Sequence, residues 1–450
     1  MTLVVLGADA AVARAAATLP ADVVHVRLPG AAPLDVPAAA YHAADYQHGP
    51  TFLRFVDEVL RPLAPAAVVS LTELGLEPAA VAARRLGAAG VPPEVVRATR
   101  DKLEMRRLLE RKAPHLNPPF AAGDDARAVA GLFAPDGGRG GGRGDGSGGH
   151  SGGHSGHGTR GGRPGHGPGG HRGGPRGAGA GALVVAKPVG GTGSHAVTLL
   201  RAAEDLPEDR RNRATLLERY VGGREFSVES LSSGGRHTFL GIAEKRTEGE
   251  AFVEVAHLMP PPSLGAAGRR RVERAVAELL DAVGLADGPA HTEVKVEGGR
   301  VTVIETHTRP GGDGIPDLVR LTRRVDWRRA ALGWVLGVGP REEPGEAVAA
   351  AATVFVTAPP GRVASVAPRP EPAAWRLEHW DVPVEPGDPV TPLRSSADRL
   401  GTALLTAPGP AACAAAVTAL RATPVVTTRP ANTPPPARPR TPFSDPGAGG

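Results

Sequence analysis

Short apolar runs alternate with Ala-rich or amphipathic segments along the first hundred residues. This pattern predicts strands over 3–7, 23–28 and 66–71 and helices over 10–18 and 78–89. Strands that alternate with helices are typical of a parallel sheet with helices on its faces. The segment after the first strand, GADAAV, lacks the full GxGxxG spacing, so it does not indicate a dinucleotide fingerprint.

The rest of the chain mixes strands, helices and turn signals in a less regular order. The pattern predicts helices over 101–113, 269–283 and 410–421, strands over 183–189, 216–221, 225–231, 352–357 and 362–366, and a hairpin formed by HTEVKV and RVTVIET. We therefore expect a mixed architecture, α/β at the start and α+β later, with a small α+β unit at 341–422.

Two segments are too poor in large apolar residues to fold. Residues 137–181 hold 24 Gly and five His in 45 positions and no apolar side chain longer than Ala, so nothing offsets the entropy of ordering them. Residues 423–450 are rich in Pro. We predict a disordered insertion and a disordered tail, which leaves ordered blocks at 1–97, 98–340 and 341–422.

Composition narrows the class of protein. The single cysteine, Cys413, excludes a disulfide framework and a zinc site built on cysteines. No apolar run approaches the ~18 residues that a membrane span needs, and the N-terminus lacks the basic region of a signal peptide. We expect a cytoplasmic protein with no membrane partner.

The net charge of +5 is not spread over the chain. The segment 137–181 holds six Arg and one Asp, which accounts for all of that charge, so the remaining residues sum to zero. Net charge therefore gives no support for a nucleic-acid-binding face on the ordered blocks, and we expect no nucleic-acid partner.

A glycine-rich loop follows one predicted strand in AKPVGGTGSHAV. Lys187 ends the strand and supplies a positive charge, and Gly190, Gly191 and Gly193 let backbone N–H groups approach a polyphosphate. The GxxxxGK[ST] order of a P-loop is absent. An ordinary glycine-rich surface turn is the alternative interpretation.

The segment LLERYVGGREFSVES carries two carboxylates around a Gly-Gly turn. Glu218 lies on a short apolar strand, and the backbone groups of Tyr220 and Val221 are placed to meet an adenine edge. Glu225 is a candidate acceptor for ribose hydroxyls. For either carboxylate alone, an exposed side chain on a half-buried strand is the simpler interpretation.

The hairpin carries the strongest chemical signal. Strand alternation puts charged residues on one face of each strand, with Glu293 in the first and Glu305 in the second. Two opposed carboxylates destabilise a sheet unless a cation lies between them, and Mg²⁺ takes such oxygen ligands together with waters and phosphates. A loop of odd length, such as EGG or EGGRV, opposes them, whereas a two-residue Gly298-Gly299 turn puts them on opposite faces. We predict the odd loop; two solvated glutamates on an exposed face are the alternative.

Glu73 follows another predicted strand, in SLTELGL. It lies at the carboxyl end of a strand of the parallel sheet, where open sheets bind ligands. It is therefore a candidate to meet the amino group of a substrate. An acid at the start of a helix is the alternative, because acids favour first helical turns.

In order and spacing, these segments resemble the ATP-grasp superfamily, and within it the carboxylate–amine ligases that include L-amino acid ligases. The resemblance implies an ATP-grasp domain at 98–340 with a nucleotide lid, after a Rossmann-like domain at 1–97 and before the small C-terminal subdomain, and it implies ATP and Mg²⁺ (or Mn²⁺) as cofactors. It assigns the nucleotide to Lys102, Lys187, Gly190, Gly191, Gly193, Ser194, Glu218, Tyr220, Val221, Glu225 and Lys245, the metal to Glu293, Glu305 and His307, catalysis to Arg309, Lys187 and His307, and substrates to Arg309, Gly311 and Gly312 beside Glu73. His307 departs from the pattern, because many members have Asn there.

The resemblance implies a ligase that activates a carboxylate, expected to belong to an amino acid, as an acyl phosphate and joins it to an amine. A biotin-carboxylase-like or purine-pathway enzyme would use the same nucleotide site, and a non-catalytic nucleotide-binding protein is a third alternative. The expected partners are small-molecule carboxylates and amines. A homodimer is left open.

Overall fold

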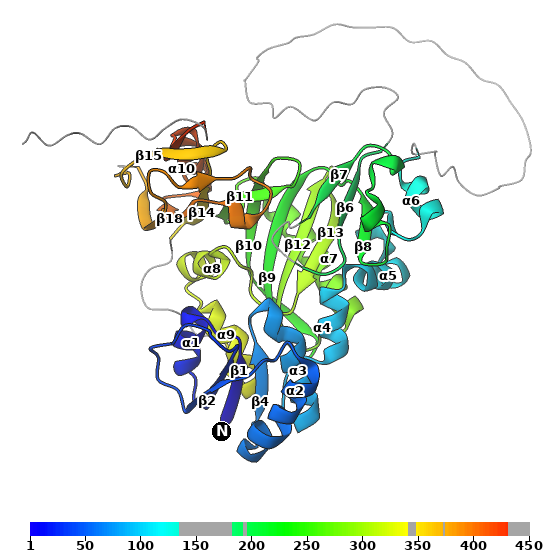
Figure 1. Ribbon diagram of the computed structural model, residues 1–450, viewed down its shortest axis with the longest axis vertical. Coiled ribbons are helices and arrows are strands. Elements are labelled where there is room, and N and C mark those ends of the chain that lie inside the picture. The colour runs from blue at the N-terminus through cyan, green and yellow to red at the C-terminus, as the bar shows by residue number, and fades with distance from the viewer. Residues whose placement is uncertain (135–181, 192–195, 341–347, 372–373, 431–450) are drawn as a thin grey trace, which may run out of the picture.

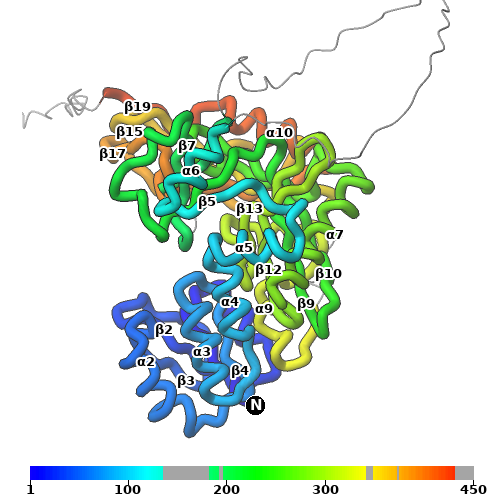
Figure 2. Tube along the Cα trace, turned by 90° about the vertical axis from the view of Figure 1, so that its right-hand side faces the viewer, coloured from blue at the N-terminus to red at the C-terminus, as the bar shows by residue number. Residues whose placement is uncertain are grey.

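The computed structural model describes residues 1–134, 182–191, 196–340, 348–371 and 374–430. The predicted insertion at 137–181 lies outside the described residues, as does most of the predicted tail. Figures 1 and 2 show the N-terminal block at one end of the molecule, and a large sheet together with the C-terminal strands toward the other end.

The N-terminal block contains a four-stranded sheet in the order β3-β2-β1-β4, and all its neighbouring strands run parallel. The strands β1, β2 and β4 are buried almost throughout, as in parallel sheets that helices cover on both faces. The predicted parallel sheet is therefore confirmed. Its elements are β1 (Thr2–Leu6), α1 (Ala10–Ala17), β2 (Asp22–Arg27), β3 (Ala40–Ala43), α2 (Gly49–Phe55), β4 (Ala67–Ser70) and α3 (Leu76–Leu86).

An antiparallel eight-stranded sheet forms the body of the molecule, in the order β13-β12-β9-β10-β11-β14-β18-β16. Its strands are β9 (Arg224–Ser233), β10 (Arg236–Glu248), β11 (Val253–Met259), β12 (Gly288–Glu297), β13 (Arg300–His307), β14 (Ala350–Val356), β16 (Arg376–Asp381) and β18 (Gly401–Ala407). The last three come from the C-terminal part of the chain, so that part continues the same sheet.

Helix α7 (Ala266–Val283) covers one face of this sheet near β9, β12 and β13. Its Val276 and Leu279 belong to one apolar core with Phe226 of β9 and Val294 of β12. Because side chains alternate along a strand, the residues between these apolar ones point to the opposite face. That opposite face carries the charged residues of the site.

A second antiparallel sheet has four short strands in the order β5-β8-β6-β7. Its elements are β5 (Phe120–Ala122), α6 (Ala126–Leu132), β6 (Val184–Pro188), β7 (Thr198–Leu200) and β8 (Thr215–Arg219). Helices α4 (Pro93–Arg100) and α5 (Lys102–Lys112) connect it to the N-terminal block, and α8 (Ile315–Arg323) and α9 (Trp327–Gly333) follow the hairpin of the large sheet.

The C-terminal part adds a three-stranded sheet in the order β17-β15-β19, formed by β15 (Gly361–Val366), β17 (Pro389–Val390) and β19 (Val426–Arg429), and the helix α10 (Pro410–Ala422). Strand β19 corrects the expectation that residues 423–450 are disordered throughout. Val426 is buried in one apolar core with Val363 of β15, and this burial offsets the entropy of ordering the segment.

No helix within the described residues is both long enough and apolar enough to cross a membrane.

Candidate active site

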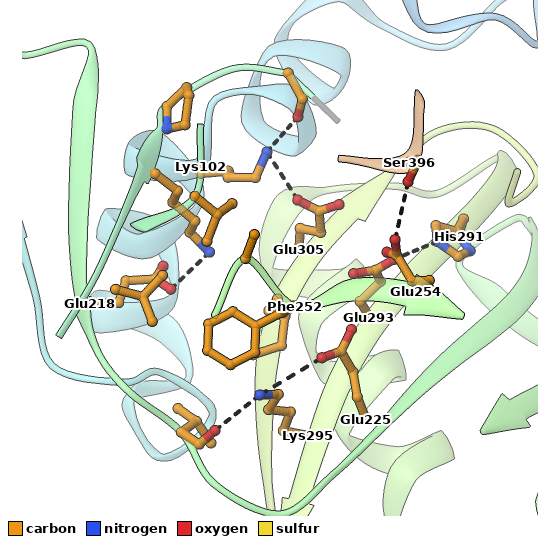
Figure 3. Close-up of a pocket in the computed structure, with 18 of the residues that line it drawn as sticks. Lys102, Glu218, Glu225, Phe252, Glu254, His291, Glu293, Lys295, Glu305 and Ser396 are labelled. Carbon is orange, nitrogen blue, oxygen red and sulfur yellow. Dashed lines mark hydrogen bonds and ion pairs between the residues drawn. The ribbon is translucent and has the colours of Figure 1, made fainter. Parts of the chain in front are cut away.

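A cavity of about 1330 Å³, its open mouth included, is lined by residues of both antiparallel sheets. Helix α5 contributes Lys102 and the C-terminal part contributes Ser396. Figure 3 shows the charged side chains that converge on the cavity.

Glu293 and Glu305 face each other across β12 and β13, but the loop that joins these strands is not the one predicted. Glu297 pairs with Arg300, so the turn has two residues, Gly298 and Gly299. Both have positive φ, 55° and 85°, as a tight type I′ hairpin turn requires. The prediction of an odd loop is therefore wrong.

A β-bulge restores the opposition of the two carboxylates. Val294 pairs with Val303 while Glu293 pairs with Glu305, so Ile304 is an extra residue in β13. One extra residue shifts the pairing by one position and so brings Glu305 onto the face of Glu293. The sequence argument missed both the two-residue turn and the bulge. Each shifts the register by one residue, so the two errors cancelled and Glu293 still faces Glu305.

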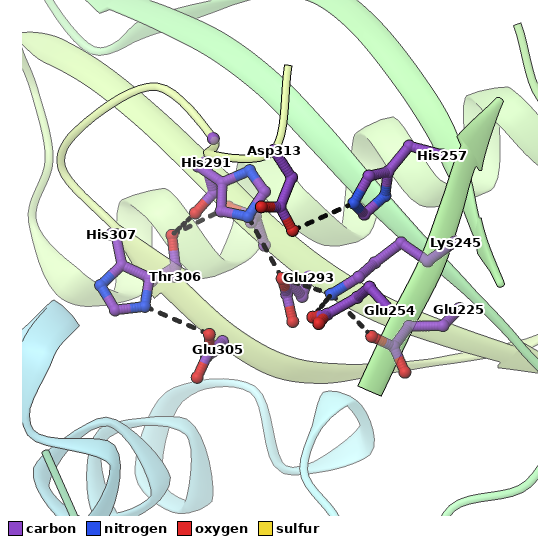
Figure 4. A network of polar contacts seen from close by, with 12 residues as sticks. Glu225, Lys245, Glu254, His257, His291, Glu293, Glu305, Thr306, His307 and Asp313 are labelled. Atoms are coloured by element: carbon purple, nitrogen blue, oxygen red, sulfur yellow. Dashed lines mark hydrogen bonds and ion pairs between the residues drawn. The ribbon is translucent and has the colours of Figure 1, made fainter. Parts of the chain in front are cut away.

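Lysines neutralise these carboxylates. Lys245 Nζ lies 2.5 Å from Glu293 Oε1, 2.9 Å from Glu225 Oε1 and 3.1 Å from Glu254 Oε1. Lys102 Nζ lies 3.0 Å from Glu305 Oε2. Figure 4 shows the network around Lys245.

The charges of this network persist despite burial. Burial alone would raise the pKa of Glu293, but the charge of Lys245 outweighs burial and the repulsion from Glu305 and holds that pKa at about 2. Burial likewise opposes ionisation of Glu305, yet Lys102 and His307 hold its pKa well below the usual range. The pKa of Lys245 rises well above its ordinary value, because its three carboxylates outweigh desolvation.

Lys187, expected to meet phosphates, lies on β6 with its ammonium 2.8 Å from Glu218 Oε2. Burial lowers the pKa of Lys187 more than Glu218 raises it. Arg106, which the sequence argument missed, donates from Nε to Glu218 Oε1 at 2.5 Å and from Nη2 to Ile304 O at 2.8 Å. Arg106 therefore links the Lys187 pair to the bulge that orients Glu305.

Glu73 meets the site from the N-terminal block. Its Oε2 lies 3.0 Å from Arg309 Nε and 3.2 Å from His307 Nδ1, and its Oε1 accepts from Arg100 Nε at 2.8 Å. Burial would raise the pKa of Glu73, but His307, Arg309 and Arg100 together hold it well below the usual range. His307 Nε2 also lies 3.3 Å from Glu305 Oε1. The structure therefore brings together four predicted site residues: Glu73, Glu305, His307 and Arg309.

Gly311 and Gly312 follow Arg309 in the loop RPGGD. The N–H of Gly311 donates to Glu229 Oε2 at 2.9 Å, so it is not available to a substrate carboxylate as expected. Glu229 is fully buried and also accepts from His291 Nδ1 and from Trp327 Nε1. Sequence reasoning missed Glu229, although strand alternation places it on the same face as Glu225.

Asp313 ends the same loop and ties it to the C-terminal part. Its carboxylate accepts two hydrogen bonds from Arg399, at 2.7 and 2.8 Å, and lies 3.4 Å from His257 Nε2. Ser396 Oγ, near Arg399 in the chain, donates to Glu254 at 3.2 Å. The C-terminal part thus closes one side of the cavity, which the sequence argument did not anticipate.

The other predicted nucleotide residues that the structure describes lie around the cavity wall. Gly191 O accepts from Lys102 Nζ at 2.7 Å, and Val221 O accepts from Lys295 Nζ at 3.1 Å. Gly190 and Tyr220 also line the cavity. Gly193 and Ser194 lie outside the described residues.

The donor set of this site fits Mg²⁺. Among the described residues, no three His, Cys, Asp or Glu side chains form a ready-made metal centre. Mg²⁺ does not require one, because it is usually held by one or two carboxylates together with waters and substrate phosphates. The ionised, opposed Glu293 and Glu305 supply such carboxylates, and His307 adjoins Glu305.

Family models match two parts of the chain. The model of the ATP-grasp domain matches residues 181–317 and that of the L-amino acid ligase C-terminal domain 2 matches residues 354–428. Together with the opposed carboxylates and the two-sheet cavity, these matches define an ATP-grasp protein. More particularly, the two matched domains, an ATP-grasp domain and an L-amino acid ligase C-terminal domain, indicate an enzyme of the ATP-grasp ligase type.

Solved structures agree on the fold. An L-amino acid ligase from Bacillus licheniformis superposes with a TM-score of 0.69 at 18% identity, over 95% of this chain and 98% of that one. A phosphoribosylglycinamide synthetase from Anaerococcus prevotii gives 0.63 at 13% identity, over 95% and 99%. The biotin carboxylase domain of the Hydrogenobacter thermophilus 2-oxoglutarate carboxylase, solved as a dimer with MgADP, ADP and bicarbonate, gives 0.61 at 15% identity, over 94% and 90%. Among curated proteins, no sequence matches this chain closely enough to count as a relative.

Proposed function

We propose that this enzyme activates the carboxylate of an amino acid as an acyl phosphate, at the expense of ATP, and joins it to an amine. The products are an amide or dipeptide, ADP and phosphate. The observation that carries the proposal is the opposed pair Glu293 and Glu305, partly buried and ionised beside Lys102 and Lys245. The match to an L-amino acid ligase C-terminal domain favours an amino acid over bicarbonate.

The chemistry needs two substitutions. A substrate carboxylate oxygen attacks the γ-phosphorus of ATP, and the bond from that phosphorus to the bridging oxygen breaks and releases ADP. The amine nitrogen then attacks the acyl carbon, the carbon–oxygen bond to phosphate breaks, and the nitrogen loses its extra proton to solvent. Both steps depend on positioning and on neutralising the phosphoryl oxygens.

We assign the charge-neutralising work to named side chains. Glu293 and Glu305 would hold Mg²⁺, which would offset the negative charge of the phosphates. Lys102 and Lys187 would bind the phosphates beside the backbone of the glycine-rich loop. Arg309, which lines the cavity, would stabilise the charge that develops on the acyl phosphate.

Substrate contacts form the second part of the assignment. Glu73, held by Arg100 and Arg309, would anchor the substrate amino group at the edge of the N-terminal block. Gly312 lines the cavity and would present its N–H to the carboxylate of the acceptor. His307 would orient Glu305 and Glu73, because its two ring nitrogens lie 3.3 and 3.2 Å from them.

The test is a screen of ADP release with pairs of amino acids and with bicarbonate, followed by mass spectrometry of the product. We expect release to depend on a carboxylate–amine pair, on Mg²⁺ and on Glu305. Glu305→Gln should abolish it, whereas Glu297→Gln, an exposed glutamate at the end of β12 in the same hairpin, should not. The proposal fails if no pair stimulates release, or if bicarbonate alone does.

A further inference from the structure

An arginine of the C-terminal part contacts the loop that carries Gly312. We call residues 309–313 the acceptor loop. The loop ends at Asp313, whose carboxylate accepts hydrogen bonds from both terminal nitrogens of Arg399, at 2.7 and 2.8 Å. A bidentate pair of this kind fixes the orientation of the two groups as well as their distance. Because Asp313 lines the cavity, the pair connects the cavity wall to the C-terminal part.

The side chain of Arg399 is itself held by other groups. Its Nε donates to Ser396 O at 2.9 Å, and its guanidinium carbon lies 3.7 Å from the centroid of the Phe355 ring, within the range of a cation–π contact. Phe355 is buried on β14 of the large sheet, and the Arg399 side chain is only 12% exposed. A guanidinium fixed in this way loses little further freedom when it binds Asp313.

The backbone at Asp313 has a conformation that its neighbours must maintain. Its φ is 57°, in the left-handed region, where residues other than glycine are uncommon and persist when the surrounding structure holds them. The next residue, Gly314, has a φ of 77° and begins α8 as its N-cap. Besides Arg399, the Asp313 carboxylate meets His257 Nε2 at 3.4 Å, as Figure 4 shows. The two partners therefore hold the sharp turn from the acceptor loop into α8.

Gly312 lies between two anchors of the acceptor loop. On one side the N–H of Gly311 donates to the buried Glu229 at 2.9 Å, and on the other side Asp313 is paired with Arg399. The carbonyl of Gly312 accepts from the N–H of Ile315 at 2.9 Å. A Cβ on Gly312 would meet no described atom within 4 Å, so this residue faces open space in the cavity that it lines. Its position therefore depends on the two anchors and not on packing of its own.

A second arginine attaches the C-terminal part to the large sheet without reaching the acceptor loop. Arg421 Nη2 lies 2.5 Å from Glu248 Oε1, and its Nη1 donates to Phe355 O at 3.1 Å. Its side chain is 18% exposed, close to the value for Arg399. Among the described residues that line the cavity, neither Arg421 nor Glu248 is included. Arg421 therefore offers a comparison in which only the attachment of the C-terminal part is weakened.

We propose that Arg399 is a positioning residue, which holds the acceptor loop through Asp313 so that Gly312 meets the acceptor amine. The inference rests on the proposed function in that the ligand of this loop is the amine substrate. In this arrangement the C-terminal part contributes to the reaction through Arg399, which positions the loop and does not itself bind the acceptor.

Two measurements on the full chain test the proposal. The first is hydrogen exchange of the amides in the peptide that spans 309–313. The second is the kinetics of ADP release, with ATP and the acceptor of the most active amino acid pair varied in turn. Arg399→Met keeps an apolar stem beside Phe355 but removes the guanidinium. We expect faster exchange in the loop, a KM for the acceptor about ten-fold higher and an unchanged KM for ATP.

Three further variants show whether the contact itself is responsible. Arg399→Lys keeps the charge but not the planar fork, so its acceptor KM should rise less than that of Arg399→Met. Asp313→Gly relieves the positive φ but removes the carboxylate, and it should raise the acceptor KM as Arg399→Met does. The double variant should rise no further, because both changes break one contact. Arg421→Met is the matched control and should leave loop exchange and both KM values unchanged.

The outcomes separate this proposal from the ligase proposal. Arg399 is not a positioning residue if Arg399→Met leaves loop exchange unchanged, if Arg421→Met raises the acceptor KM equally, or if the effects of Asp313→Gly and Arg399→Met add. If Arg399→Met does not fold, Arg399→Lys and Asp313→Gly decide by the same measurements. If no amine stimulates ADP release by the unmodified chain, the ligase proposal fails, and loop exchange in Arg399→Met still decides whether Arg399 holds the loop.

Discussion

Arg106 is a buried guanidinium on which both the Lys187 pair and the hairpin bulge depend, and its loss should destabilise the chain strongly. Its side chain is 0% exposed. It donates to Glu218 at 2.5 Å, to Ile304 O at 2.8 Å and to Asn117 Oδ1 at 3.3 Å. Arg106→Met keeps an apolar side chain of similar length but removes all three donors.

The expected magnitude follows from what remains unpaired. Removing one partner of a buried ion pair costs about 3–5 kcal/mol, and an unsatisfied buried carbonyl costs about 1–3 kcal/mol. In the variant Lys187 still pairs with Glu218 at 2.8 Å, which reduces the cost of the broken ion pair. We therefore expect the free energy of unfolding to fall by about 3 kcal/mol.

The assay is urea denaturation of the full chain followed by circular dichroism. Arg84→Met is the matched control, because Arg84 pairs with Glu94 at the surface, where the two side chains are 58% and 62% exposed and such pairs contribute about 0–1 kcal/mol. Arg106→Lys should fall between the two, since an ammonium lacks the fork that reaches Glu218 and Ile304 O together. A loss for Arg106→Met no larger than that for Arg84→Met would refute the reasoning.

Three further predictions concern the acceptor loop, acid stability and the cysteine. A Cβ on Gly311 would lie 2.7 Å from His291 Nδ1, so Gly311→Ala should lower the free energy of unfolding by about 1–3 kcal/mol. A Cβ on Gly312 would meet no described atom within 4 Å, so Gly312→Ala should keep the stability of the chain. Its methyl group would enter the cavity that Gly312 lines and should raise the KM of the amine; an unchanged KM would contradict the role of Gly312. Burial lowers the pKa of His25 from 6.5 to about 4. Between these pH values only the unfolded chain takes up the proton, so the free energy of unfolding should fall by up to about 3 kcal/mol as pH drops from 6.5 to 4. Urea titrations at pH 7 and 4.5 should show a smaller pH effect in His25→Phe. Burial raises the pKa of Cys413 to about 12, so iodoacetamide at pH 8 should label the folded chain far more slowly than the chain in urea, and equal rates would contradict its burial.

Local pattern predicted most of the elements around the site. The helical spacing at 269–283 corresponds to α7, and the apolar runs at 3–7 and 183–189 correspond to β1 and β6. These elements follow from periodicity because each must bury one face or stripe of apolar side chains. The family resemblance rests on the same segments, so the ATP-grasp class could be named from sequence.

The hairpin shows where local pattern was insufficient. Alternation correctly placed Glu293 and Glu305 on charged faces, but the Gly298-Gly299 turn and the extra residue Ile304 each change the register by one. A bulge depends on contacts from elsewhere, here on Arg106, which donates to Ile304 O from a helix 198 residues away in sequence. The sequence of the hairpin itself contains no signal that Arg106 is the partner of Ile304 O.

Along this chain, the order of residues was enough to predict many of the strands and helices, the class of enzyme and the residue types that carry charge. The tertiary structure decided which partner each charge has. Lys245 forms ion pairs with three carboxylates, Glu229 accepts a hydrogen bond from the N–H of Gly311, and Asp313 pairs with Arg399. Coulomb energy depends on distance and on the exclusion of water, and both arise only when segments remote in sequence are folded against each other.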